Sequence, residues 1–203
     1  MSIIRAFYNQ KAFPNILMVA IKDAVVHACK TQNHICALYD KAGELLGYNI
    51  ECEDYPYTKD GYQKISKALL NYINEKLNAE GFPELEHDFT PRIVVGHIKK
   101  CEEHPDSDHL HVCLVDVGKR QVQIVCGASN VKEDQYVVVA LDQAVLADGK
   151  LILKGKLRGI ESEGMICSEW ELGLIDHKEK GILVLDKTNY VGNDFFGKDE
   201  DNV

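Results

Sequence analysis

Residues 154–168 read KGKLRGIESEGMICS and combine three glycines with alternating basic residues. The glycines stand at positions 155, 159 and 164, where they allow tight bends and a close approach of the backbone to a ligand. Lys154, Lys156 and Arg158 alternate along the chain, so on an extended strand they would share one face. Such a face could form a track for phosphates. A solvated strand face is the plainer alternative, and the basic pattern by itself favours it.

The segments around this stretch predict a small β-barrel. Residues 121–128 place Val122, Ile124 and Cys126 in alternation with glutamines, which is the pattern of a half-buried strand. Residues 110–117 alternate poorly, and a barrel strand with a bulge would explain this. The predicted strands cover residues 93–99, 110–117, 121–128, 136–141 and 181–185. Because short strands with glycine-rich connections are typical of closed or partly open barrels, we expect this half to be all-β.

The first half predicts an α+β fold, made of a β-meander and one helix. Short β-rich runs cover residues 3–8, 16–21, 24–30, 35–39 and 45–50, with turn signals between them. Apolar residues then recur at helical spacing from Gly61 to Ala79. The proline-marked residues 83–91 are the predicted linker. We therefore expect an N-terminal α+β domain of residues 1–89 and an all-β domain of residues 90–203.

Composition argues against several functional classes. The 203 residues carry 23 basic and 32 acidic side chains, a net charge of −9, which is unlike a polycation that coats nucleic acid or membrane. Lys150, Lys154, Lys156 and Arg158 nevertheless form a local basic strip. No apolar run approaches the ~18 residues of a membrane-spanning helix, and no signal-peptide pattern is seen. The seven cysteines contain no C-x-x-C pair and predict reduced thiols in a cytoplasmic protein.

Two patterns raise the question of an active site. The segment 104–111, HPDSDHLH, could ligate a metal such as zinc. No second cluster completes a ligand set, and a turn with local hydrogen bonds to the backbone is the favoured interpretation. Cys126 and Cys167 could act as nucleophiles, but nothing in the sequence places a base beside either of them. Since phosphate-loop and dinucleotide spacings are also absent, we predict no catalytic residue, no metal and no cofactor.

Six blocks in family order, between Phe89 and Asn193, resemble the tRNA-binding domain family with an OB-fold. The blocks are VVG (94–96), HPDSDHL (104–110), VDVG (115–118), IVCGASN (124–130), LRGIESEGMICS (157–168) and ELGL (171–174). Members are similar to free-standing tRNA-binding proteins, to appendages of methionyl synthetases, and to the N-terminal region of the bacterial phenylalanyl-tRNA synthetase β-chain. The whole chain also resembles the YtpR-type tRNA-binding-domain proteins of low-GC Gram-positive bacteria. In the first half that resemblance rests on Ala6–Asn9 and Gly47–Ile50.

The resemblance implies a non-catalytic protein that binds RNA through the face and loops of an OB-fold. The residues carried over from the family's motifs are Lys99, His109, His111, Asn130, Arg158, Ser162, Met165 and Ser168, and the charge pattern adds Lys154 and Lys156. Basic side chains would contact phosphate, and polar groups would recognise unpaired nucleotides or the 2′-hydroxyl. Asn130, Ser162 and Met165 could instead serve structure. At position 109 many members carry a lysine, and the histidine here removes a cation at pH 7.

The expected partners follow from the same resemblance. tRNA is the expected ligand, and the resemblance also allows a homodimer or an association with a synthetase or another translation component. The alternative is a protein-interaction or assembly module that keeps the barrel and binds RNA weakly or not at all. Residues 91–203 carry 14 basic and 20 acidic side chains, a net charge of −6, which motivates this alternative.

Overall fold

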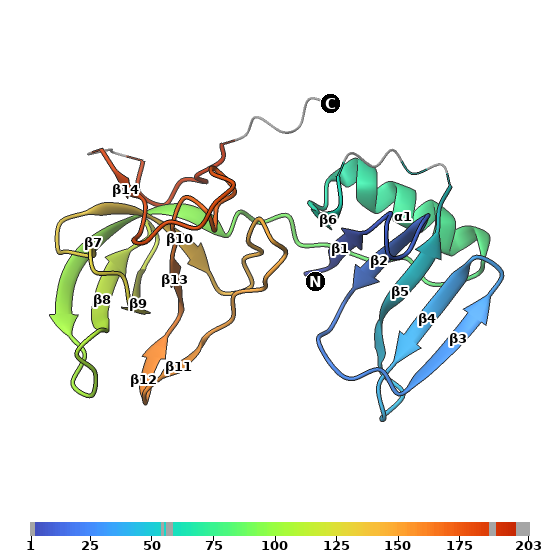
Figure 1. Cartoon of the computed structure of the whole chain (residues 1–203), viewed down its shortest axis with the longest axis horizontal. Coiled ribbons are helices and arrows are strands. Elements are labelled where there is room, and N and C mark those ends of the chain that lie inside the picture. The colour runs from blue at the N-terminus through green and yellow to red at the C-terminus, as the bar shows by residue number, and fades with distance from the viewer. Residues whose placement is uncertain (1–2, 54, 56–58, 187–189, 198–203) are drawn as a thin grey trace. The chain divides into compact units, whose positions relative to one another are not determined.

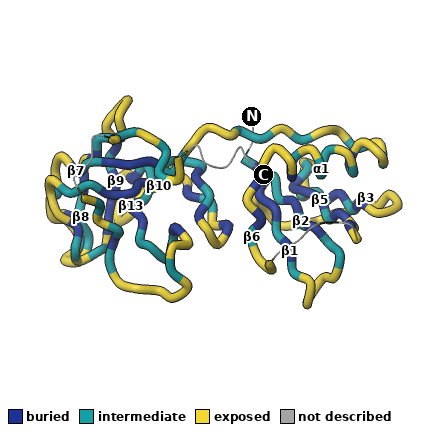
Figure 2. The backbone as a smooth tube through the Cα atoms, turned by 90° about the horizontal axis from the view of Figure 1, so that it is seen from above, coloured by how far each residue is buried: buried dark blue, intermediate teal, exposed yellow. Residues whose placement is uncertain are grey.

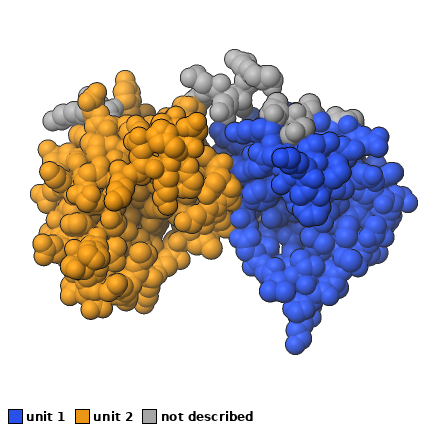
Figure 3. All heavy atoms as spheres, viewed as in Figure 1, with its two compact units in different colours: residues 1–89 blue, residues 90–203 orange. Residues whose placement is uncertain are grey.

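The chain divides into two compact units, residues 1–89 and residues 90–203, which Figure 3 colours separately. The computed structural model describes residues 3–53, 55, 59–186 and 190–197. The regular secondary structure of these residues consists of β-strands and a single α-helix. Over the same ranges no helix is both long enough and apolar enough to cross a membrane.

Unit 1 is an antiparallel sheet packed against a helix (Figure 1). Its elements are β1 (Arg5–Tyr8), β2 (Ile16–Ala20), β3 (Ala28–Gln32), β4 (Ile35–Tyr39), β5 (Leu45–Glu51), β6 (Gly61–Gln63) and α1 (Lys67–Ala79). The strand order is β3-β4-β5-β2-β1-β6, so β2 pairs with β5 and not with the next strand in sequence. Leu69, Ile73 and Leu77 recur at helical spacing and are buried in one core with residues of the sheet.

Two elements of unit 1 differ from the predicted ones. The helix begins at Lys67 and not at Gly61, because Ser66 caps it by accepting a hydrogen bond from the Leu69 amide at 3.1 Å. Residues 61–63 form the edge strand β6 instead, paired with β1. The strand expected over residues 24–30 runs from 28 to 32, because the β3–β4 register pairs Ala28 with Tyr39 and leaves residues 24–26 beyond the end of β4.

The segment predicted as a linker is partly bound to unit 1. Leu85 exchanges two hydrogen bonds with the Asn74 side chain of α1, at 2.8 and 2.9 Å. The Ile4 amide donates to His87 Nδ1 at 3.2 Å. Residues 83–91 form neither helix nor strand, but polar contacts fix the first part of this segment.

Unit 2 is built around a strongly bent antiparallel sheet (Figure 1). Its strands are β7 (Ile93–Glu103), β8 (His111–Asp116), β9 (Gln121–Cys126), β10 (Tyr136–Leu141), β11 (Gly155–Leu157), β12 (Ile160–Ser162), β13 (Gly164–Ile166) and β14 (Val184–Leu185). The order is β13-β10-β7-β8-β9, with β14 also pairing with β10 and with β11–β12 as a separate hairpin. The Glu163 amide donates to the Gln123 carbonyl at 2.9 Å, which brings the two ends of the sheet together. The sheet is therefore a nearly closed barrel.

Two apolar clusters explain why β10 is buried on both faces, as the dark blue tube of Figure 2 shows. Val137 and Val139 point into the barrel, where they pack with residues of β7, β8 and β9. Val138 and Ala140 point outward and are covered by the connection after β10 and by residues 167–185. A strand buried on both faces reads as a continuous apolar run, as residues 136–141 do.

The bulge lies in β7 and not in residues 110–117, where the poor alternation pointed. The β7–β8 register shifts between Ile98 and Lys100, so Lys99 is an extra residue on β7. Strand β8 is regular and begins at His111. Its Val112 and Leu114 face outward while still being apolar, and this weakens the alternation without any bulge.

Candidate nucleic-acid interface

The basic stretch folds as a hairpin and not as one extended strand. Strands β11 and β12 pair Lys156 with Glu161 and Leu157 with Ile160. Arg158 and Gly159 form the two-residue turn, with φ values of 45° and 83°. Positive φ at both central residues defines the hairpin turn whose twist matches the strands. The alternation expected for the basic residues therefore ends at Lys156, and Arg158 lies at the tip.

The hairpin tip is fastened to the loop between β7 and β8, residues 104–110. Arg158 Nη1 donates to the Asp106 carbonyl at 3.1 Å. His104 is only 4% exposed, and its Nε2 donates to the Leu157 carbonyl at 3.3 Å. The Asp106 amide donates to the other ring nitrogen, Nδ1, at 3.1 Å. His104 thus uses both nitrogens to hold two motif segments together, a role that the sequence pattern did not assign to it.

The base of the hairpin is fastened to β9. Ser162 is 4% exposed, and its hydroxyl accepts from the Val125 amide at 3.1 Å and donates to the Gly164 carbonyl at 3.0 Å. Gln123 Nε2 donates to the Glu161 carbonyl at 2.8 Å. These bonds continue the barrel where regular strand pairing stops. The Ser162 hydroxyl is therefore committed to the protein's own backbone.

Exposed basic side chains surround this pair of segments. Lys156 lies on β11 and Lys154 directly precedes that strand, and the Lys156 ammonium is 3.6 Å from the Glu161 carboxylate. The His109 side chain is 80% exposed on the 104–110 loop, 3.2 Å from Asp108. Arg158 is exposed and bonds to a backbone carbonyl, so its charge is not neutralised by that contact. The structure thus gathers Lys154, Lys156, Arg158 and His109 on two neighbouring loops.

A further cation, Arg120, belongs to this region and was missed in the sequence. Arg120 Nη1 lies 2.8 Å from Glu163 Oε2 beside the base of the hairpin. Its hydrogen bond is the main reason that the pKa of Glu163 is lowered. Arg120 is more than thirty residues from the hairpin in the sequence, and only the closure of the barrel brings it there.

Lys99 and His111 lie elsewhere on the barrel. Lys99 stands at the β7 bulge, and its Nζ donates to His97 Nδ1 at 2.8 Å. His111 begins β8 in the same inward phase as Cys113, and its Nδ1 is buried with no hydrogen-bond partner among the described residues. Among the described residues, neither Lys99 nor His111 forms a hydrogen bond or an ion pair with the hairpin.

Three other predicted site residues serve the scaffold. Both polar atoms of the Asn130 side chain bond to the backbone of Ile182, at 2.9 and 3.0 Å. Met165 packs against the outer apolar cluster. Ser168 begins a turn in which its amide and hydroxyl both donate to Glu171 Oε2, at 2.8 and 2.7 Å.

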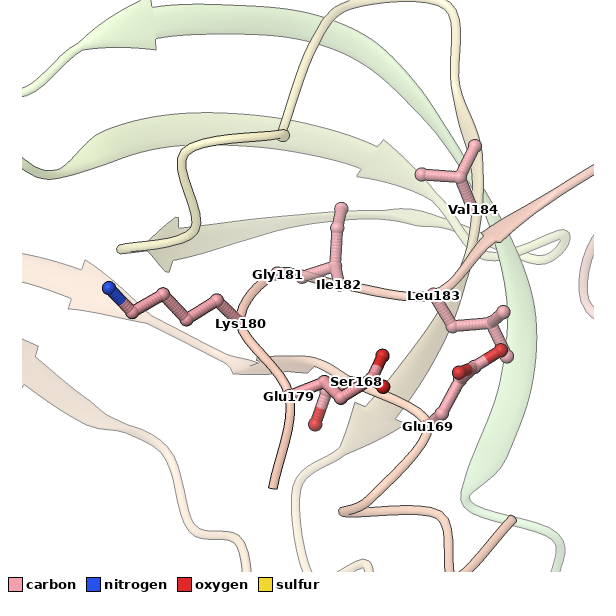
Figure 4. Close-up of a pocket in the computed structure, with 8 residues that line it drawn as sticks. All are labelled: Ser168, Glu169, Glu179, Lys180, Gly181, Ile182, Leu183 and Val184. Atoms are coloured by element: carbon pink, nitrogen blue, oxygen red, sulfur yellow. The ribbon is translucent and has the colours of Figure 1, made fainter. Parts of the chain in front are cut away.

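A shallow hollow of about 230 Å³ lies beside this turn (Figure 4). It is lined by Ser168, Glu169 and residues 179–184. In the close-up the Lys180 side chain extends away from Glu169. The hollow is smaller than the ~300–1,000 Å³ of ordinary ligand pockets, and two carboxylates on its wall oppose an anion. None of the exposed cations of the hairpin lines it.

Two catalytic alternatives were raised by the sequence, a metal site and a cysteine nucleophile. In the described part of the chain, no group of three or more histidine, cysteine or acidic side chains is placed to hold a metal ion. Burial raises the pKa of Cys167 to about 12 and also raises that of Cys126. Both thiols are protonated at neutral pH, whereas a nucleophile must be a thiolate.

Comparison with known proteins gives the family. Residues 93–194 match the family described as "Putative tRNA binding domain". The chain is 38% identical over 199 residues to "Putative tRNA-binding protein YtpR" of Bacillus subtilis, a match that covers 95% of this chain and 99% of that protein.

Two further likenesses cover about half of the chain. The β subunit of phenylalanine–tRNA ligase of Wolinella succinogenes is 55% identical over 97 residues, which are 48% of this chain and 12% of the subunit. A solved MetRS-related protein from Pyrococcus horikoshii is 18% identical, at a TM-score of 0.38, over 53% of this chain and 95% of that one. The match over residues 93–194 and the near full-length relative confirm the resemblance expected from the sequence: the chain belongs to the tRNA-binding domain family.

Proposed function

We propose that the protein is non-catalytic and binds tRNA through unit 2, acting as an OB-fold domain of residues 90–203. The observation that carries the proposal is the fastening of the β11–β12 hairpin to the 104–110 loop, with Lys154, Lys156, Arg158 and His109 exposed on the two segments. A five-stranded, partly open barrel binds oligonucleotides through one strand face and through the loops after its first and fourth strands. Here these loops are residues 104–110 and the connection that contains the hairpin.

The basic side chains define a small footprint. They sit among carboxylates, with Glu161 beside Lys156 and Asp108 beside His109. Two or three phosphate contacts are the most that such a surface supports, because each paired carboxylate offsets part of the positive field. We therefore infer modest, strongly salt-dependent affinity that relies on the shape and backbone of a folded RNA.

The carboxylates also motivate the second candidate, a protein-interaction or assembly module that binds RNA weakly or not at all. We favour tRNA because the family and the near full-length relative carry tRNA binding in their names. A homodimer or an association with a synthetase is compatible with either function, and a tRNA ligand places the protein in the bacterial cytoplasm. Residues 1–89 form the other domain of this proposal, with no role assigned to it.

A fluorescence-anisotropy titration of labelled bulk tRNA against the full chain tests the proposal. We expect binding at low salt that weakens steadily as the salt concentration rises. The assembly module predicts no tRNA binding at physiological salt, together with a stable protein partner in a pull-down. Binding that does not change between low and high salt would contradict the phosphate-contact surface.

A further inference from the structure

Two thiols face each other across neighbouring strands of unit 2. The β7–β8 register pairs Cys101 directly with Cys113. The Cys113 thiol donates to Cys101 Sγ with the two sulfurs 3.7 Å apart. All seven cysteines of the chain are free of disulfide bonds in the structure. Residues that oppose each other in an antiparallel pair project to the same side of the sheet, so only small side-chain rotations separate the two sulfurs from bonding distance.

The two members of the pair differ in access. Cys101 is partly exposed, whereas Cys113 is fully buried. Burial and the neighbouring Cys101 raise the pKa of Cys113, so its thiol stays protonated in the folded protein. An oxidant from solution would therefore react with Cys101 first, and Cys113 would be the resolving cysteine. A solvent-accessible thiol beside a resolving cysteine is the usual arrangement of a redox-responsive site.

We propose that Cys101 and Cys113 form a reversible intramolecular disulfide when the protein meets a peroxide. The Cys101 thiolate attacks one oxygen of hydrogen peroxide, the O–O bond breaks, and sulfenic acid and water form after proton uptake. The Cys113 thiol passes its proton to the sulfenic oxygen beside it, the thiolate so formed attacks the sulfenic sulfur, and the S–O bond breaks as water leaves. Two thiols and one hydrogen peroxide thus give one disulfide and two waters.

The bulge at Lys99 makes this closure easier to accommodate. It lies two residues from Cys101, where the β7–β8 register already shifts, and bulged strands adapt their twist locally. Cys126 lies in the same core cluster as Cys113, on the next strand, but its direct cross-strand partner is His111. We therefore expect Cys126 to stay reduced while the Cys101–Cys113 pair closes.

The sequence offers a direct assay. A tryptic peptide of residues 101–119 contains Cys101 and Cys113 and no other cysteine, whereas Cys126 lies in peptide 121–132. The reduced full chain is treated with hydrogen peroxide, quenched with acid and alkylated in denaturant. It is then digested with trypsin, and the peptide masses are measured by mass spectrometry. We expect peptide 101–119 to be unalkylated and two hydrogen atoms lighter than its reduced form. Treatment with dithiothreitol before alkylation should restore the reduced form. The native chain should close the pair at least about tenfold faster than the urea-unfolded chain, because folding holds the sulfurs in contact.

Exposed Cys29 has no cysteine opposite it on β4 and serves as the internal control. In a Cys113→Ala variant, peptide 101–119 should gain oxygen and should not lose two hydrogen atoms. If that variant fails to fold, the peptide masses of the parent protein still test the proposal. The proposal is overturned if both cysteines remain open to alkylation when Cys29 is fully oxidised. It is equally overturned if peptide 101–119 becomes linked to peptide 121–132.

Discussion

Replacing Ser162 with alanine should loosen the closure of the barrel in unit 2. The Ser162 hydroxyl accepts from the Val125 amide at 3.1 Å and donates to the Gly164 carbonyl at 3.0 Å. The residue is 4% exposed, so water does not readily replace the lost oxygen. The substitution therefore leaves a buried donor and a buried acceptor without their partner.

An unsatisfied buried polar group costs about 1–3 kcal/mol. A buried carbonyl left without a partner is tolerated more often than a buried amide, so the loss at Gly164 should fall at the low end of that range. We expect the free energy of unfolding of the Ser162→Ala variant to fall by about 2–4 kcal/mol. This is a large part of the ~5–15 kcal/mol that stabilises an ordinary domain.

Urea unfolding followed by tryptophan fluorescence measures this change in unit 2, because Trp170 is the only tryptophan of the chain. Ser107→Ala is the matched control. The Ser107 hydroxyl only accepts from the His109 amide at 3.3 Å in an exposed loop, so its removal should cost less than about 0.5 kcal/mol. A Ser162→Ala protein as stable as this control would refute the role given to the hydroxyl.

Three further predictions concern stability. A Cβ at Gly47 would lie 2.1 Å from a carbonyl oxygen of β2, so Gly47→Ala should destabilise unit 1 by about 1–3 kcal/mol or more in urea unfolding followed by circular dichroism, whereas Gly155→Ala, with open space around it, should not. Ser66→Ala removes the cap of α1 and should cost about 1 kcal/mol in the same assay; a variant as stable as the parent would contradict the capping role. Because the pKa of Glu163 is lowered, its pair with Arg120 stabilises the fold at pH values above the ordinary glutamate pKa of ~4.3. Arg120→Gln should therefore cost about 0.2–1 kcal/mol at neutral pH, and the difference from the parent should vanish as the pH falls through the pKa of Glu163; a difference that persists in acid would refute the pairing.

The strands of unit 2 were largely predictable because their pattern is local. Val122, Ile124 and Cys126 alternate with glutamines, and all three are buried inside the barrel. Residues 136–141 form one continuous apolar run, and the structure buries that run on both faces. In both cases the side chains themselves reveal which face of the strand meets the core.

The differences arise where a distant partner decides the local structure. Residues 61–63 continue a helical pattern but form a strand, since β1 offers them an open edge. The basic stretch reads as one extended strand, but Arg158 and Gly159 adopt positive φ and fold it back on itself. Polar contacts are harder still to foresee: His104 looked like a member of a metal-binding or turn segment, and only the folded barrel brings it to the Leu157 carbonyl.

The most direct test of the proposed tRNA surface is the salt dependence of tRNA binding in a variant without the hairpin cations. Lys154→Ala, Lys156→Ala and Arg158→Ala are combined, and the control removes three exposed lysines of unit 1, Lys11, Lys30 and Lys41. Each phosphate contact contributes about 0.7–0.9 to the slope of log affinity against log salt. We predict that the hairpin variant loses about 2 from this slope and about 100-fold in affinity near 0.1 M salt, while the control keeps the slope of the parent. A hairpin variant that binds tRNA with the affinity and slope of the parent would contradict the account.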